Sequence, residues 1–536
     1  MKRWVWAFLA CCLVCGCGAS VDDFVKVGSS SNPPPQTILD IMKRPRYSQA
    51  TWSLLVADLN TGRTFYELNP DLLSFTGSAR KLFSVGALLN EVGAESRQST
   101  TVHRQGDING GVLNGDLILV AGGDLTFGGR RIGPNTIQVT NNDHNSANGP
   151  GTAILTPQDP LFGLNQLAAQ VKAAGVDSVS GEIVVDDRLF QTYRVPNGNV
   201  LTTPMYLNEN LIDVTVTPTT PGQAAALVYR PQTGFFDVLN QATTSANGTD
   251  LDITFSGGGL TDGVGDTGTV SGQIPADHVA PLTGLNSFVG TYRVEDPNSF
   301  VRTAFIEALQ SQGVTVTAAP VAANPAAVLP ADFQYDAGTR LAEFLSVPYS
   351  EHARLILKVS LNQGANLSLS LFGVEKGERT VARALAAERQ TLTNEFGLAP
   401  DSFDFPSNGS GSPDSRANPR ALVNMLATMS QTPVADPYRA ALPILGVDGT
   451  LAHSGQALPA RGHVFAKTGT TISPDANNQL EIKAKTLAGY VDTRSGRRVV
   501  FALIMNNGGP VTNLVDDLEA VLEDQAEISN EIYELL

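Results

Sequence analysis

The chain has 536 residues, of which 42% are hydrophobic and 16% charged, and its formal net charge at pH 7 is −16. This length exceeds what one hydrophobic core serves, so more than one domain is expected, and the apolar share is ordinary for globular domains. The negative charge argues against nucleic acid or an anionic membrane surface as a partner.

The N-terminus has the pattern of a secretory signal. Lys2-Arg3 precede a short apolar run that ends at Val14-Cys15-Gly16-Cys17, which resembles a lipoprotein cleavage motif with Cys17 as the lipidated residue. Residues 1–16 are therefore predicted to be a lipoprotein signal peptide, and residues 17–36 a flexible tether. All four cysteines lie in this region, so the mature chain is expected to have no disulfide. The alternative is a plain secretory signal.

Ser78 and Lys81 are predicted to be a nucleophile and its base. A serine hydroxyl is a poor nucleophile until a neighbouring base takes its proton. The sequence from Lys81 to Leu89 predicts a helix, and side chains three residues apart on a helix share one face and can touch. Lys81 is the only lysine of the chain with a serine three positions before it.

A lysine acts as a base only in its neutral form. Its ordinary pKa is about 10.4, so the site must lower the pKa of Lys81 by about three units. The positive end of the helix dipole, next to Gly77, and burial both act in this direction.

The middle of the chain has mixed strand and helix patterns. Strands are predicted at 115–120, 181–185, 211–217, 225–230 and 251–255, and helices near 164–174 and 301–312. Residues 263–268 match a glycine-rich dinucleotide-binding pattern, but no helix pattern follows them, so a turn is predicted there instead.

A second motif, Ser360-Leu361-Asn362, comes at the end of an apolar helical run. The other Ser-Xaa-Asn triplets of the chain lie in stretches rich in glycine, proline and asparagine, which predict loops. Of these triplets, Ser360-Leu361-Asn362 is therefore the best candidate for a functional motif.

The third motif is Lys467-Thr468-Gly469, followed by Thr470. Strands are predicted on either side of it at 463–466 and 487–492, with a further strand at 498–505. A lysine and hydroxyls on an edge strand can hold a peptide carboxylate while the strand backbone pairs with the peptide. The chain then closes with an acidic amphipathic helix, predicted at 514–536 to pack on the sheet.

Motifs for cofactors are not found. The sequence has no phosphate loop and no zinc-protease motif, and its six histidines show no metal-ligand spacing. No cofactor and no metal are predicted.

The motifs Ser78-Ala79-Arg80-Lys81, Ser360-Leu361-Asn362 and Lys467-Thr468-Gly469, in this order, are the signature of penicillin-recognising enzymes. Nearly the whole mature chain resembles the low-molecular-mass class C penicillin-binding proteins, the D-alanyl-D-alanine carboxypeptidase/endopeptidases. Further segments that carry the resemblance are Gly115-Asp116-Leu117-Ile118-Leu119, Gly122-Gly123-Asp124, Asp186-Asp187, Tyr206-Leu207-Asn208-Glu209-Asn210 and Gly446-Val447-Asp448-Gly449-Thr450-Leu451.

The resemblance implies a serine DD-peptidase acting on peptidoglycan stem peptides that end in D-Ala-D-Ala. Ser78 would attack the carbonyl of the penultimate D-Ala, and Lys81 would accept its proton. Ser360 would relay a proton toward the leaving group, and Asn362 would hold the substrate amide.

The resemblance also implies how the substrate is held. Lys467 and Thr468, with Gly469 beside them, would bind the terminal carboxylate. The oxyanion hole would be the backbone N–H groups of Ser78 and Thr470, and such donors contribute about 2.7–4 kcal/mol each. β-Lactams would be inhibitors, and cleavage of peptide cross-links would be a second activity.

Two segments depart from the family pattern. Leu361 replaces the usual acidic residue of the second motif, and Gln363-Gly364-Ala365-Asn366-Leu367 replaces the usual continuation. The stretch from Asn408 to Arg416 is altered at its first position and lengthened. These departures leave the nucleophile and the base intact.

The spacing of the motifs indicates the architecture. From Ser78 to Ser360 is 282 residues, far more than a compact β-lactamase-like domain needs. The predicted fold is α+β: a penicillin-binding-protein/β-lactamase-like domain, with an antiparallel sheet flanked by helices, and a large mixed α/β insertion. Residues 37–100 and 345–536 are predicted to form the discontinuous transpeptidase-like catalytic domain, and residues 101–344 the inserted accessory domains.

The sequence is also compatible with two other functions. The first is a β-lactamase or esterase of the same fold, and the second is a non-catalytic cell-wall-binding lipoprotein. For all three functions, the expected location is the periplasm, with a lipid anchor in the outer membrane.

Overall fold

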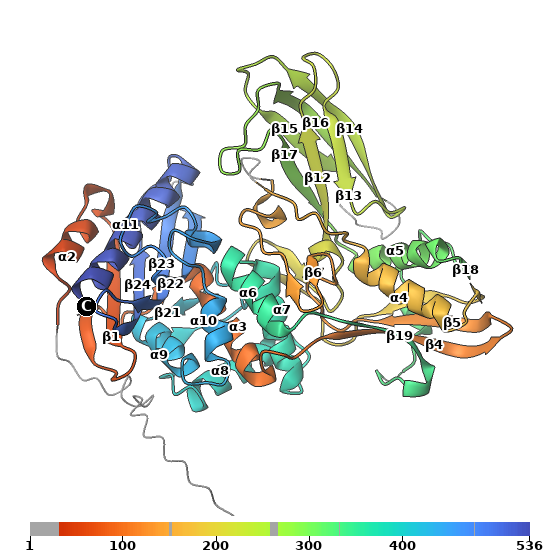
Figure 1. The fold of residues 1–536 in the computed structure, drawn as a ribbon, viewed down its shortest axis with the longest axis horizontal. Coiled ribbons are helices and arrows are strands. Elements are labelled where there is room, and N and C mark those ends of the chain that lie inside the picture. The colour runs from red at the N-terminus through yellow and green to blue at the C-terminus, as the bar shows by residue number, and fades with distance from the viewer. Residues whose placement is uncertain (1–31, 149–152, 258–265, 332, 476–477) are drawn as a thin grey trace, which may run out of the picture.

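The computed structural model describes residues 32–536 except 149–152, 258–265, 332 and 476–477 (Figure 1). The predicted signal peptide, Cys17 and most of the predicted tether therefore lie outside the described residues. So does the first half of the glycine-rich pattern at 263–268, whose second half begins a strand. Within the described ranges, none of the helices has the length and apolar character needed to cross a membrane.

The centre of one domain is a five-stranded antiparallel sheet. Its strands, in spatial order, are β2 (Thr64–Leu68), β1 (Thr51–Asp58), β24 (Arg498–Asn506), β23 (Leu480–Asp492) and β22 (Val464–Pro474). Two of these strands come from the N-terminal part of the chain and three from the C-terminal part. β22 is an edge strand, so one side of its backbone is available for pairing with another peptide.

Helices cover both faces of this sheet (Figure 1). Successive strand residues point to opposite faces, so Leu54 and Val56 enter one core while Leu55 and Ala57 enter another. The first core is closed by α2 (Gln36–Met42) and α11 (Leu514–Leu535). The second is closed by α3 (Lys81–Val92), α6 (Tyr349–Val359), α7 (Asn362–Glu375), α8 (Val381–Asn394), α9 (Pro419–Met429) and α10 (Ala435–Ala440). The sheet and these helices are called the sheet domain below.

The sheet domain is interrupted by an insertion that leaves and returns on paired strands. β4 (Ser99–Asn109) and β19 (Arg340–Leu345) run antiparallel, with Ser99 opposite Leu345. The predicted limits of the insertion, 101 and 344, fall inside these two strands. Figure 1 shows the insertion extending away from the sheet domain.

The insertion has its own hydrophobic core, and its described residues form three sheets of three or more strands, two smaller two-stranded sheets and two long helices. A six-stranded mixed sheet contains β4, β19, β5 (Val112–Val120), β8 (Ser178–Val179), β9 (Ile183–Asp186) and β18 (Thr315–Val316). A second sheet contains β12 (Leu211–Thr217), β13 (Ala226–Arg230) and β17 (Phe288–Arg293), and a third contains β14 (Phe236–Ser245), β15 (Asp252–Gly257) and β16 (Asp266–Pro275). The helices are α4 (Phe162–Ala173) and α5 (Pro297–Ser311).

The predicted fold class is confirmed: the fold is α+β, with an antiparallel sheet flanked by helices and a large mixed insertion. The short strands not yet mentioned are β3 (Ser74–Phe75), β6 (Arg131–Gly133), β7 (Thr136–Ile137), β10 (Tyr193–Val195), β11 (Val200–Thr202), β20 (Phe403–Asp404) and β21 (Arg416–Ala417).

Candidate active site

Ser78 lies in a 3₁₀ turn, Gly77–Arg80, that leads directly into α3 at Lys81. Side chains at i and i+3 eclipse each other in a 3₁₀ turn, and Ser78 Oγ lies 2.7 Å from Lys81 Nζ. Gly77 has φ = +51°, and a Cβ atom on it would lie 2.6 Å from the backbone nitrogen of Thr470. A glycine is therefore required there, and its absence of a side chain brings the start of the turn against the third motif.

Lys81 is fully buried, and its amine faces several oxygen atoms. Nζ lies 2.7 Å from Asn362 Oδ1, 3.2 Å from the carbonyl oxygen of Ser410 and 3.3 Å from Ser360 Oγ. Burial, and next the charge of Lys467, holds the pKa of Lys81 well below its ordinary value.

This environment suits a neutral amine. A neutral lysine has two hydrogens and one lone pair, so it can donate to Asn362 and to the Ser410 carbonyl and still accept the proton of Ser78. Lys81 can therefore act as the base for Ser78.

The second motif lies where α6 ends and α7 begins. Ser360 follows the last residue of α6 and adopts a left-handed conformation, with φ = +62° and ψ = +38°. This turn places Ser360 Oγ between two amines, 3.3 Å from Lys81 Nζ and 2.9 Å from Lys467 Nζ. A hydroxyl in this position can pass a proton between groups on either side of it.

The third motif lies inside β22, not after a strand that ends at 466 as the sequence had predicted. Lys467 Nζ donates to Ser360 Oγ at 2.9 Å and to the carbonyl oxygen of Thr468 at 2.8 Å. Burial, and then the charge of Lys485, lowers the pKa of Lys467 to about 7. A Cβ atom on Gly469 would lie 2.0 Å from the carbonyl oxygen of Thr76, so only glycine lets the strand pass this close to the nucleophile turn.

The two segments that depart from the family pattern both build the site. Asn366 Oδ1 accepts a hydrogen bond from the backbone N–H of Gly409 at 2.9 Å. Asn408 Oδ1 accepts from the N–H groups of Ser410 and Gly411, at 2.8 and 2.7 Å. These bonds fix the loop that presents the Ser410 carbonyl to Lys81.

The structure brings the sequence-predicted residues together. Lys81 and Lys467 are buried, whereas Ser78, Ser360, Asn362 and Thr470 are partly exposed. The amines therefore lie beneath a surface of hydroxyl and amide groups that a substrate can reach. The predicted site residues that lie in this cluster are Ser78, Lys81, Ser360, Asn362, Lys467, Thr468, Gly469 and Thr470.

Sequence reasoning missed three contributors. The Ser410 carbonyl could not be found, because a backbone atom carries no residue signal. Thr450 Oγ1 lies 2.8 Å from Thr468 Oγ1, although its segment had been noted only as a family resemblance. Lys485, on β23, donates to Thr470 Oγ1 at 3.1 Å. Its signal was a lysine within a largely apolar strand.

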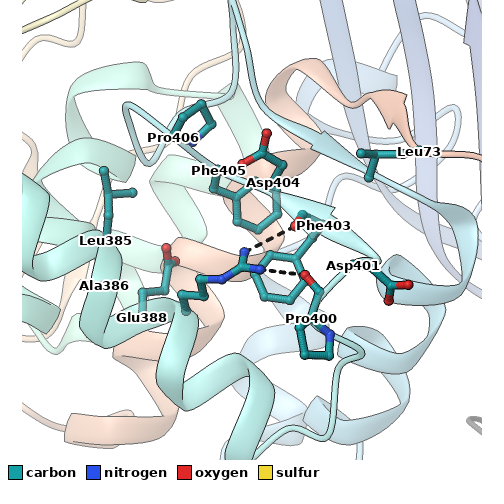
Figure 2. A pocket seen from close by; sticks show the side chains of 11 residues that line it. Leu73, Leu385, Ala386, Glu388, Pro400, Asp401, Phe403, Asp404, Phe405 and Pro406 are labelled. Atoms are coloured by element: carbon teal, nitrogen blue, oxygen red, sulfur yellow. Dashed lines mark hydrogen bonds between the residues drawn. The ribbon is translucent and has the colours of Figure 1, made fainter.

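A separate pocket of about 480 Å³ lies between α8 and residues 400–406 (Figure 2). It contains none of the sequence-predicted site residues. Glu388, in its wall, forms a buried ion pair with Arg80, the residue before Lys81. Among the described residues, no group of three or more histidine, cysteine or acidic side chains is placed to hold a metal ion.

Comparison with known proteins agrees with this geometry. A family described as "D-Ala-D-Ala carboxypeptidase 3 (S13) family" matches residues 35–525. The chain is 28% identical over 514 residues to a D-alanyl-D-alanine carboxypeptidase of Actinomadura sp. (strain R39), covering 90% of this chain and 82% of that protein. It is 32% identical over 204 residues to the carboxypeptidase DacB of Mycolicibacterium smegmatis, covering 34% of this chain and 40% of that protein.

Among solved structures, penicillin binding protein 4 (dacB) from Haemophilus influenzae is similar with a TM-score of 0.68 and 17% identity. The match covers 93% of this chain and 99% of that one. At this identity the likeness establishes the fold. The same Haemophilus protein has also been solved in complex with a β-lactam.

Proposed function

The chain belongs to the D-Ala-D-Ala carboxypeptidase 3 (S13) family and is a serine-type DD-peptidase of peptidoglycan, and we propose that Ser78 is its nucleophile and Lys81 its base. The observation that carries this proposal is the 2.7 Å separation of Ser78 Oγ from Lys81 Nζ, in an environment that favours the neutral amine.

In the acylation step, Ser78 Oγ attacks the carbonyl carbon of the penultimate D-Ala and its proton moves to Lys81 Nζ. The backbone N–H groups of Ser78 and Thr470 receive the negative charge that develops on the carbonyl oxygen. Gly77 supports the joint use of these two N–H groups, because its lack of a side chain brings the turn that carries Ser78 into contact with Thr470. The peptide bond then breaks, and the leaving amine takes a proton from Ser360, which Lys81 replenishes.

In the deacylation step, water attacks the acyl ester. Lys81, neutral again, accepts a proton from the water and passes it to Ser78 Oγ as the ester bond breaks. The products are the shortened stem peptide and free D-alanine.

The proposed role of the third motif is to hold the substrate. Lys467 donates two hydrogen bonds within the protein, to Ser360 and to its neighbour's carbonyl, and an ammonium group has three hydrogens. The third is available to the terminal carboxylate, beside the Thr468 hydroxyl. The open edge of β22 can pair with the peptide backbone.

The direct test is release of D-alanine from a pentapeptide that ends in D-Ala-D-Ala. We expect release by the wild-type protein and none by Ser78→Ala, which keeps the fold. A wild-type protein that hydrolyses a β-lactam rapidly but releases no D-alanine would be a β-lactamase of the same fold. A protein that fluorescent penicillin does not label would be a non-catalytic binding protein.

We further propose that the enzyme cleaves peptide cross-links, because the structure has room for a leaving group larger than D-alanine. A pocket of about 220 Å³ lies next to Thr450, whose hydroxyl contacts that of Thr468. Leu522 of α11 and Asn141 and Leu282 of the insertion also line it. A leaving group whose carboxylate binds at Thr468 could extend its side chain into this space.

This second activity has its own test. Leu282→Trp, which fills the pocket, should slow cleavage of a cross-linked muropeptide dimer at least several-fold while leaving D-alanine release unchanged. Equal effects on the two substrates would remove the pocket from the argument.

We also propose that the protein is exported to the periplasm and anchored by a lipid on Cys17. The support for this proposal is the basic and apolar N-terminus with its cleavage motif.

A further inference from the structure

Lys485 is a buried lysine next to the third motif that the proposed mechanism does not use. It lies on β23 directly opposite Thr470 of β22, and its amine donates to Thr470 Oγ1 at 3.1 Å. The residue is 4% exposed. Among the described residues, the other side chain bonded to Lys485 is that of Gln525, which donates to its backbone carbonyl, a bond that any residue could accept.

Burying this amine is unfavourable for folding. Desolvation lowers the pKa of Lys485 to about 8, and no described carboxylate contributes to its environment. Lys358, by contrast, is also largely buried but pairs with Asp448 at 2.6 Å. Lys467, on the neighbouring strand, is a second buried amine whose described surroundings supply no acidic partner. The charge of Lys485 lowers the pKa of Lys467 further. Two such amines side by side are expected where an anion binds.

We propose that Lys485 is a second cation of the carboxylate site and acts on the terminal carboxylate of the substrate through the hydroxyl of Thr470. This proposal rests on the proposed role of the third motif in holding that carboxylate. It assigns Lys485 as a positioning residue, because its amine contacts Thr470 and is itself shielded from the substrate.

The orientation of the Thr470 hydroxyl supports this assignment. Oγ1 accepts a hydrogen bond from Lys485, so its own hydrogen points elsewhere and can donate to a carboxylate. Thr468 and Thr470 are two residues apart on one strand, so their side chains share a face. Thr470 is partly exposed, which makes it the contact between the buried charge and the substrate.

The test removes the charge while keeping the shape. Lys485→Met should raise KM for a D-Ala-D-Ala peptide about tenfold and change kcat by less than about twofold, as expected for loss of one charge-supported hydrogen bond. KM for the C-terminal amide of the same peptide should not change. Lys483→Met, two residues away on the same strand, is the matched control and should behave as wild type.

A second variant tests the path through Thr470. Thr470→Val keeps the backbone N–H but removes the hydroxyl, so it should raise KM selectively for the carboxylate substrate. The double variant should be no worse than the stronger single variant, because both changes break one chain of contacts. Effects that add would mean that Lys485 does not act through Thr470 and would overturn the proposal.

Stability separates this role from a structural one. A buried cation without a carboxylate partner does not stabilise the folded state, so Lys485→Met should unfold at the same temperature as wild type or higher. A lower unfolding temperature, or equal losses on the acid and the amide substrate, would overturn the proposal in favour of a packing role. If the wild-type protein itself releases no D-alanine, the proposed function has failed; if it does and Lys485→Met is unaffected, only this inference has failed.

Discussion

Lys467 on β22 and Ser360 at the end of α6 are joined by a hydrogen bond of 2.9 Å between Nζ and Oγ. The third motif is thus tied to the second, and Ser360 is in turn 3.3 Å from the amine of Lys81. The proposed base, the proposed proton relay and the proposed carboxylate site form one continuous chain of polar atoms. A change in any of them is expected to affect its neighbours.

The first prediction concerns acylation. Penicillin should form a covalent adduct on Ser78, located by mass mapping of the digested protein. Lys81→Met should lower the acylation rate by a factor of roughly 10²–10⁴, the usual contribution of a general base, and should still fold, because it replaces a buried amine to which no described carboxylate is paired. An adduct on another serine, or fast acylation of the variant, would contradict the assignment.

The second prediction concerns the terminal carboxylate. Lys467→Ala should slow hydrolysis of a D-Ala-D-Ala peptide much more than hydrolysis of its C-terminal amide. The difference in kcat/KM should correspond to about 1.5–3 kcal/mol, the value of a hydrogen bond to a charged group. Equal losses would assign Lys467 to proton transfer through Ser360 instead.

The third prediction concerns pH and stability. The pKa of Lys467 falls from 10.5 to about 7 on folding, so between these pH values the unfolded chain binds more protons than the folded one. The free energy of unfolding that Lys467 contributes therefore rises as the pH increases from about 7 to 10 and is constant below.

Lys467→Met removes this dependence. Measured by guanidinium unfolding, the variant should gain most over wild type at pH 7 and below, and the gain should shrink by on the order of a few kcal/mol toward pH 10. A difference independent of pH would show that Lys467 remains protonated throughout this range in the folded protein.

The fourth prediction concerns the buried ion pair between Arg80 and Glu388, of which Glu388 lines the pocket in Figure 2. Arg80 donates to Glu388 through both terminal nitrogens and to the carbonyl oxygen of Asn408 through Nε. Glu388→Gln leaves the guanidinium unpaired, which should cost about 3–5 kcal/mol.

The same variant should also slow acylation, because Asn408 fixes the loop that contacts Lys81. Thermal unfolding and penicillin labelling provide the two measurements. Glu375→Gln, on the exposed side of α7, is the control and should change neither.

The fifth prediction concerns the N-terminus. Mature protein should begin at a lipid-modified Cys17 and partition into detergent, and Cys17→Ser should release or misprocess it. Unmodified wild-type protein cut at another residue would indicate a soluble periplasmic enzyme.

The three motifs could be predicted because their chemistry depends on local spacing. Ser78 and Lys81 are one turn apart, and the order of the motifs along the chain is characteristic. The predicted strands at 211–217 and 225–230 correspond to β12 and β13, and in β12 the apolar residues Ile212, Val214 and Val216 alternate with polar ones.

Long-range pairing was beyond such reasoning. β14 and β16 were missed, because exposed Leu239 breaks the alternation of β14, and their parallel pairing joins residues thirty positions apart. The role of Lys485 depends on the register of β23 against β22, which the sequence does not encode in any local pattern.

The paired strands at the base of the insertion have a consequence for how such a protein can arise and be altered. Ser99 and Leu345 face each other across neighbouring strands, so the ends of the insertion are separated by about one inter-strand spacing, roughly 5 Å. A short loop could therefore close this gap, but Leu125, Ile137, Phe190 and Tyr206 of the insertion belong to the same core as α3 and α6. Gene segments of very different length can be exchanged beyond these contacts, and the outer part of the insertion can diverge while the distance between Ser78 and Ser360 stays fixed.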